Sequence, residues 1–95
     1  MIEVIRHDGG ISVKGHAHYA EPGKDIVCAA VSILVQNLIQ SIEELTPDKI
    51  EYEIQPGWVC IKHGNLSEKA KSLVDSFFIG IRMVIEDYPE NVRRE

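Results

Sequence analysis

Cys28 and His16 are two side chains whose types and spacing could support nucleophilic catalysis in this 95-residue sequence. Cys28 falls in the first turn of a predicted helix, and His16 lies twelve residues earlier, at the end of a predicted strand. The unpaired N–H groups and aligned peptide dipoles of a helix N-terminus favour a thiolate. A histidine delivered beside that thiolate could act as a general base, so the two residues could form a Cys–His pair.

Two observations favour a structural role for the same residues, without catalysis. A cysteine in an apolar helix is more often a small buried side chain than a nucleophile. The period-two alternation of residues 11–17 also places His16 on the polar face of its strand, away from the apolar face on which a helix would pack. A bend at Gly15 would redirect the strand end toward Cys28. Both geometries stay open at this point.

Asp25 and Ser32 are candidate supporting residues. Asp25 is the predicted N-cap of the helix, where its carboxylate can accept the N–H of Cys28. That contact would occupy an oxyanion donor, and the negative charge would oppose a thiolate. We therefore interpret Asp25 as a structural cap rather than as a residue that orients His16. Ser32 lies one turn after Cys28, where its hydroxyl could either bond back to a helix carbonyl or support the catalytic pair.

The pattern of apolar residues, turns and caps predicts two strand pairs and two long helices in one domain, residues 1–95. The order β-β-α-β-β-α predicts an α+β fold, a two-layer sandwich whose antiparallel-rich sheet carries both helices on one face. In chain order, the predicted segments are strands 2–7 and 11–17, loop 19–24, helix 26–45, strands 49–55 and 58–62, helix 66–88 and a polar tail 90–95.

Both helices carry more apolar surface than a single buried stripe requires. The first helix is apolar on nearly all sides between Ile26 and Val35, which predicts burial against more than one partner. The second helix is apolar over more than one stripe at residues 77–81. Part of that second surface is predicted to form a homodimer interface, although it could also simply cover the sheet.

Composition and charge narrow the class of protein. The formal net charge is −5 and no basic face is visible, which argues against general binding to a nucleic-acid backbone. The longest apolar run, Ile26–Val35, is about half of what a membrane span needs, and the N-terminus begins as a strand without a basic leader. Two cysteines are too few for a disulfide-stabilised secreted scaffold. We therefore expect a cytoplasmic protein with free thiols and no membrane contact.

Two alternatives to a thiol enzyme remain. The first is a zinc site, whose possible ligands are His16, His18, Cys28, Cys60 and His63. Neither a Cys-x-x-Cys motif nor a helical histidine pair with a glutamate supports it, so we predict no metal and no cofactor. The second is a non-enzymatic ribosome-assembly or regulatory module that acts through dimerisation.

A longer motif around the two candidate residues separates these alternatives. The stretch Gly15-His16-Ala17, followed by the block Gly23-Lys24-Asp25-Ile26-Val27-Cys28-Ala29-Ala30-Val31-Ser32, resembles the ribosomal-processing cysteine protease family Prp. The resemblance covers essentially the whole chain. It implies a homodimeric endopeptidase that uses Cys28 as nucleophile and His16 as general base.

The resemblance also implies a substrate. Members of the family remove the N-terminal extension of large-subunit ribosomal protein twenty-seven before or during ribosome assembly in certain bacteria. The partner expected for this chain is therefore a ribosomal protein precursor, with an aromatic-rich extension followed by a small residue. The segment from His18 to Pro22 varies most within the family, so the resemblance assigns it no catalytic role.

Overall fold

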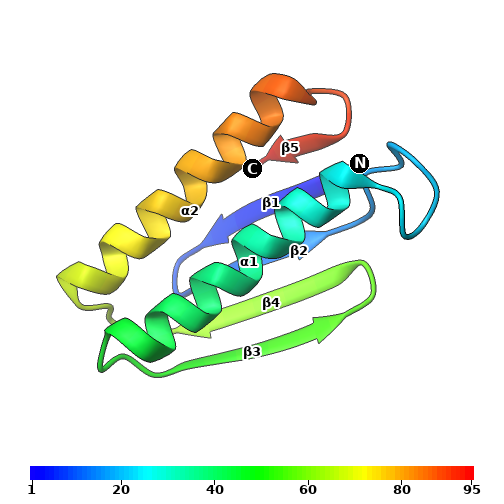
Figure 1. Cartoon of the computed structure of the whole chain (residues 1–95). Coiled ribbons are helices and arrows are strands. Elements are labelled where there is room, and N and C mark those ends of the chain that lie inside the picture. The colour runs from blue at the N-terminus through cyan, green and yellow to red at the C-terminus, as the bar shows by residue number, and fades with distance from the viewer.

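The structure, a computed structural model, describes all residues 1–95 and has the predicted β-β-α-β-β-α order, followed by one additional strand. Its α+β class and its antiparallel-rich sheet with both helices on one face confirm the sequence prediction (Figure 1). The elements are β1 Ile2–His7, β2 Gly10–Lys14, α1 Ile26–Leu45, β3 Ile50–Gln55, β4 Trp58–His63, α2 Glu68–Asp87 and β5 Val92–Arg94.

The sheet has the strand order β3-β4-β2-β1-β5. The pairs β1–β2, β2–β4 and β3–β4 are antiparallel, whereas β5 pairs parallel to β1. The predicted polar tail at residues 90–95 was therefore wrong in part. Val92, at the start of β5, is completely buried and lies opposite Ile2. A three-residue strand with a single apolar residue gives no period-two pattern, so tertiary pairing alone reveals it.

The hydrophobic core lies between the sheet and the two helices. In Figure 1, α2 runs along the β1 side of the sheet and α1 along the β2 and β4 side. Seventeen buried residues from both layers form one cluster, and its side chains are almost entirely aliphatic apart from Phe77 and Phe78. The opposite face of the sheet carries no helix, although Ser12 on that face is buried and its hydroxyl contacts the ring of His7.

The first helix, α1, has the predicted bounds and the predicted cap, Asp25. Its burial differs from the expectation. Ile26 and Ile33 are 56% and 63% exposed, so α1 buries one side against the sheet and α2 and leaves the other side open. By length and composition alone, α1 could also span a membrane. The sequence analysis did not predict this, because it considered only the apolar run Ile26–Val35. The buried side chains of α1, however, belong to the core cluster, as expected of the central helix of a globular domain.

The second helix, α2, begins after Ser67, which is its N-cap. The Ser67 hydroxyl accepts the N–H of Ala70 at 3.2 Å. Asp48, from the loop after α1, accepts both the N–H and the hydroxyl of Ser67 at 2.8 Å. This contact ties the start of α2 to the end of α1. Further along, the α-carbon of Gly80 lies against Leu34, which lets the two helices approach closely.

Strand β2 ends at Lys14, three residues before the predicted end. Gly15 follows with φ +94°, a left-handed conformation that side chains rarely adopt. The bend at Gly15, which was one of the two geometries left open by the sequence, is therefore present. As a result, His16 does not follow the alternation of the strand.

Candidate active site

Cys28 lies in the first turn of α1, and its side chain is half-buried. Its Sγ accepts the backbone N–H of Ala17 at a distance of 3.4 Å. The sulfur therefore meets a peptide dipole from the chain that follows β2, in addition to the positive end of its own helix. Both features place positive partial charge beside the sulfur.

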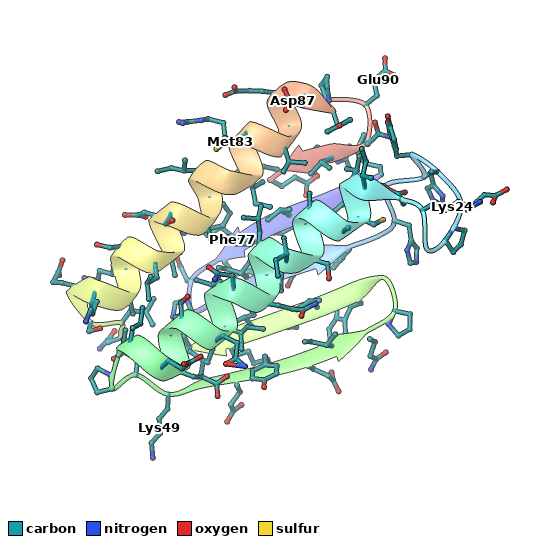
Figure 2. All side chains as sticks on the ribbon, in the orientation of Figure 1. Lys24, Lys49, Phe77, Met83, Asp87 and Glu90 are labelled. Carbon is teal, nitrogen blue, oxygen red and sulfur yellow. The ribbon has the colours of Figure 1, made fainter.

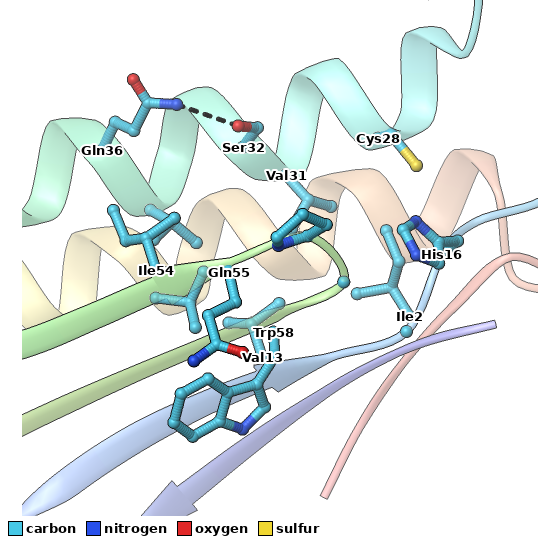
Figure 3. Close-up of a pocket in the computed structure, with 15 residues that line it drawn as sticks. Ile2, Val13, His16, Cys28, Val31, Ser32, Gln36, Ile54, Gln55 and Trp58 are labelled. Atoms are coloured by element: carbon cyan, nitrogen blue, oxygen red, sulfur yellow. Dashed lines mark hydrogen bonds between the residues drawn. The ribbon is translucent and has the colours of Figure 1, made fainter. Parts of the chain in front are cut away.

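His16 follows the bend at Gly15, and two backbone contacts hold this short segment. The N–H of Gly15 donates to the carbonyl of Gly57, in the turn between β3 and β4, at 2.8 Å. The N-terminal ammonium group of Met1 donates to the carbonyl of His16 at 2.6 Å. In Figure 3 the sulfur of Cys28 points from α1 toward the His16 ring. The residue is exposed, so its imidazole is accessible to solvent and to a ligand.

Asp25 organises the segment between His16 and Cys28. One carboxylate oxygen, Oδ1, accepts the N–H groups of Val27 and Cys28, each at 3.0 Å. The other, Oδ2, accepts the N–H groups of Tyr19 and Ala20 at 3.0 Å and 3.4 Å. The predicted cap is thus confirmed, and the same carboxylate also fixes the loop. Partial desolvation acts to raise the pKa of Asp25, but the hydrogen bonds to its carboxylate outweigh that effect and lower the pKa below its usual 3.8.

Two cavities meet at the candidate residues, and both are lined by His16, Cys28 and Ser32. The first is a groove of about 250 Å³ between α1 and the β3–β4 hairpin (Figure 3). Its walls are mainly apolar, with Val35 and Ile54 among the lining residues. The second cavity, of about 580 Å³, lies between the start of α1 and the loop after His16.

The sequence also matches a known protein family. Residues 1–93 match the model of the family described as "Cysteine protease Prp". The chain belongs to the cysteine protease Prp family. It is therefore a cysteine protease of the ribosomal-processing class, not a non-enzymatic module.

Individual members of the Prp family share the full length of the chain. The ribosomal processing cysteine protease Prp of Staphylococcus aureus is 28% identical, over 97% of this chain and 93% of that protein. A crystal structure of the S. aureus protease with a covalently linked product peptide has the same fold, with a TM-score of 0.89 at 23% identity over 99% of this chain and 95% of that one. A Streptococcus mutans protein of known structure gives a TM-score of 0.79 at 31% identity, over 99% and 90% of the two chains.

Ser32 lines both cavities with His16 and Cys28, so its supporting role beside that pair stays a prediction. Its hydroxyl accepts a hydrogen bond from Nε2 of Gln36, one turn further along α1, at 3.0 Å. Both residues line the groove (Figure 3). The Ser32–Gln36 pair is therefore a polar edge on a mainly apolar groove.

The possible zinc ligands do not converge. Cys60 lies opposite Ser12 and Glu53 in the sheet, and the ring of His63 contacts the carbonyl of Gly64. His18 stays near His16, with ring centroids 6.1 Å apart. No three histidine, cysteine or acidic side chains lie together in a way that could hold a metal ion.

The β3–β4 hairpin is the part of the site that the sequence analysis missed. Ile54, Gly57 and Trp58 line the groove beside Cys28, although they lie 26 or more positions away from it in the chain. The sequence showed a tight turn at residues 55–57 but no reason for that turn to meet His16. The strand order β3-β4-β2 brings the turn beside Gly15, and strand order is a tertiary property.

Proposed function

We propose that this protease removes the N-terminal extension of the precursor of large-subunit ribosomal protein twenty-seven, with Cys28 as nucleophile and His16 as general base and acid. The observation that carries the proposal is that His16 and Cys28, which lie on separate segments, line the same two cavities. The helix N-terminus and the N–H of Ala17 support a thiolate at this position. The full-length match to ribosomal processing proteases supports the substrate class.

The chemistry follows from the two side chains. His16 takes the thiol proton of Cys28, and the sulfur attacks the carbonyl carbon of the scissile peptide bond. The carbonyl π electrons move to the oxygen, which becomes an oxyanion. When the tetrahedral intermediate collapses, the C–N bond breaks and His16 gives its proton to the leaving amine. Water, deprotonated by His16, then attacks the thioester and releases the acid, which returns the thiol.

The oxyanion requires a hydrogen-bond donor beside the sulfur. The N–H groups of Val27 and Cys28 are engaged by Asp25, so the first turn of α1 does not offer them freely. The N–H of Ala17 donates to the sulfur rather than to Asp25, and this hydrogen bond weakens once the sulfur has bonded to the carbonyl carbon and lost its negative charge. Ala17 is therefore the backbone donor best placed to stabilise the charge that develops on the substrate.

The two cavities suggest how a peptide would lie. An extended chain that passes over Cys28 would occupy the apolar groove on one side of the scissile bond and the loop cavity on the other. Val35 and Ile54 would contact an apolar side chain in the groove. This division supports a substrate with apolar residues on one side of the cleaved bond.

We propose a homodimer in the cytoplasm as the working form. The aliphatic residues that remain exposed on the helices support an apolar interface of this kind. Within the predicted stretch 77–81, Phe77, Phe78 and Ile81 are buried in the core, while Ile79 is 49% exposed. Apart from Leu45 at the very end of α1, the exposed large hydrophobic side chains of the helices are Ile26, Ile33, Ile79 and Met83.

Incubation with the ribosomal protein precursor tests the function. Two product masses whose sum equals the precursor plus one water are expected from the native protein. Cys28→Ser should leave the fold intact and lower the cleavage rate by at least about a thousandfold, because a serine hydroxyl is a much weaker nucleophile without a thiolate. Cys60→Ser is the matched control, since Cys60 lies opposite Ser12 on another part of the sheet, and it should cleave normally. Cleavage by Cys28→Ser at the native rate would refute the assignment.

A further inference from the structure

Gly57 lies directly against the ring of His16. It occupies the turn between β3 and β4 with φ +71°. A Cβ atom added to Gly57 would stand 2.6 Å from Nε2 of His16, 3.2 Å from Cε1 and 3.3 Å from Cδ2. All three atoms belong to the Nε2 end of the imidazole, so this end of the ring occupies the space where a side chain of residue 57 would begin.

The same turn also holds the backbone that carries the ring. The carbonyl of Gly57 accepts the N–H of Gly15, the residue whose left-handed conformation turns the chain toward Cys28. Gly57 thus contacts the segment twice, through its carbonyl at the bend and through its α-carbon at the imidazole. The ring of His16 also lies near the ring of His18, and the two ring centroids are 6.1 Å apart.

We propose that Gly57 is a positioning residue for the general base, because its missing side chain leaves the space in which the His16 ring sits beside Cys28. Any larger residue would displace the imidazole, since a real Cβ atom does not approach a ring nitrogen to 2.6 Å. The ring is exposed to solvent, so it can move away rather than compress. This inference rests on the proposed role of His16.

The substitution Gly57→Asn separates this role from a simple requirement for glycine. Asparagine tolerates a positive φ better than other residues with a side chain, so the turn can survive while the Cβ atom is added. Gly9→Asn is the matched control. Gly9 also has a positive φ, +80°, in a hairpin turn, but the neighbour of its added Cβ is the carbonyl oxygen of His63, away from the active site.

Three measurements are made on the native protein and both variants: kcat for the precursor peptide, the rate of Cys28 alkylation against pH, and the thermal unfolding midpoint. Gly57→Asn is expected to lower kcat by about 10- to 100-fold, as misplacement of a catalytic group by about 1 Å does. It should also move the alkylation profile to higher pH, because the thiolate loses its imidazolium partner. His18 and Asp25 line the same cavity and are retained in all three proteins, so a difference in profile reports on His16.

Gly9→Asn should change neither kcat nor the profile. If Gly57→Asn behaves like Gly9→Asn, or if its kcat falls while its profile stays in place, the positioning role is refuted. If Gly57→Asn does not fold, a measurement on the native protein replaces it. Nuclear Overhauser effects are expected between the α-protons of Gly57 and the ring protons of His16. Their absence would overturn the proposal. A native protein that fails to cleave the precursor would refute the proposed substrate, but the shift in profile would still establish the positioning of His16.

Discussion

Among single residues, Asp25 connects the greatest number of separate parts of the active site. Its two carboxylate oxygens accept four backbone N–H groups, two from the first turn of α1 and two from the loop after His16. The side chain therefore sets both the direction of the helix that carries Cys28 and the course of the chain that leaves His16. It contacts the backbone on both sides of the catalytic pair, and it also lines the loop cavity with His16 and Cys28.

Asp25→Asn tests this double role. An amide has one oxygen acceptor, and its NH₂ group would face either the helix N–H groups or those of Tyr19 and Ala20. We expect kcat/KM for precursor cleavage to fall by at least about tenfold, because a loosened loop misplaces the reacting groups. Amide exchange at Tyr19 or at Val27 should rise in the variant. Native kcat/KM together with unchanged exchange at both positions would contradict the double role.

The pH dependence of the Asp25 contacts follows from its lowered pKa. The folded state holds this carboxylate ionised to a lower pH than the unfolded state does, so the stabilising contribution is complete above about pH 3.8 and is lost as the pH falls through the lower folded value. The loop contact should therefore persist throughout the neutral range. This behaviour distinguishes it from a contact that depends on histidine, which would change between about pH 5 and 8.

The residues of the active site differ in how far sequence alone could predict them. The cap by Asp25 was predictable because it depends on residues three positions apart. The contacts of Asp25 to Tyr19 and Ala20 were not, since a loop with Pro22 and Gly23 has no periodic pattern that fixes its course. The bend at Gly15 could be named as an option, but only the fold shows that it is used.

Among the elements, the β3–β4 hairpin forms the wall of the groove that faces α1. Ile54 lies on the edge strand β3 and is 53% exposed, although it lines the same groove as Val35 of α1. The apolar surface of that wall is therefore exposed in the groove, where it can contact a ligand, and is not buried in the core.

Ile54→Ser should raise KM for the precursor peptide by about 5- to 30-fold with little change in kcat, since the lost burial of an aliphatic side chain costs about 1–2 kcal/mol of binding. Tyr52→Ser, two residues away on the same edge strand and 48% exposed, does not line the groove and serves as the control. Equal KM values for the two variants would show that the substrate does not occupy the groove.

Strand β5 is the element that sequence reasoning did not find. Val92→Ala should destabilise the protein by about 1.5–3 kcal/mol, because it removes buried methyl groups and leaves a small cavity. Thermal denaturation measures this loss, and a domain of this size should melt about 6–20 °C lower. Glu90→Ala, at an exposed position just before the strand, should change the midpoint little. A similar small effect for Val92→Ala would mean that β5 does not pair with β1 in solution.

The longer elements were predictable for a physical reason. Each long helix has a local cap and a helical repeat of apolar residues, and each hairpin has a glycine turn between alternating strands. These signals depend on neighbours in the chain. The sheet order β3-β4-β2-β1-β5 depends on which strands meet after collapse, so it lay beyond the sequence patterns.

On the scale of the whole molecule, the two-layer arrangement leaves the outer side of the helices uncovered. Met83 lies on the outer side of α2 (Figure 2) and is 59% exposed, and Ile33 on α1 is 63% exposed. A 95-residue domain has a small core, so burial of these side chains against a second copy would add stability.

Met83→Asp tests the proposed homodimer. A buried carboxylate at an apolar interface is strongly unfavourable, so the variant should sediment as a monomer at concentrations where the native protein is a dimer. Leu45→Asp places the same charge at the end of α1, at a residue 52% exposed, and is the control for the change in net charge. A native protein that is monomeric at all concentrations, or a dimer that both variants retain, would contradict an interface at Met83.

The most direct test of the account is the rate of Cys28 alkylation between pH 5 and 9 in the native protein and in His16→Ala. If the two side chains form a thiolate–imidazolium pair across the cavity they share, the native protein should react at lower pH, and removal of the imidazole should shift the profile to higher pH. Mass determination of the modified peptide confirms that Cys28, not Cys60, has reacted. Superimposable profiles for the two proteins would show that His16 and Cys28 are not coupled and would contradict the proposed catalytic pair.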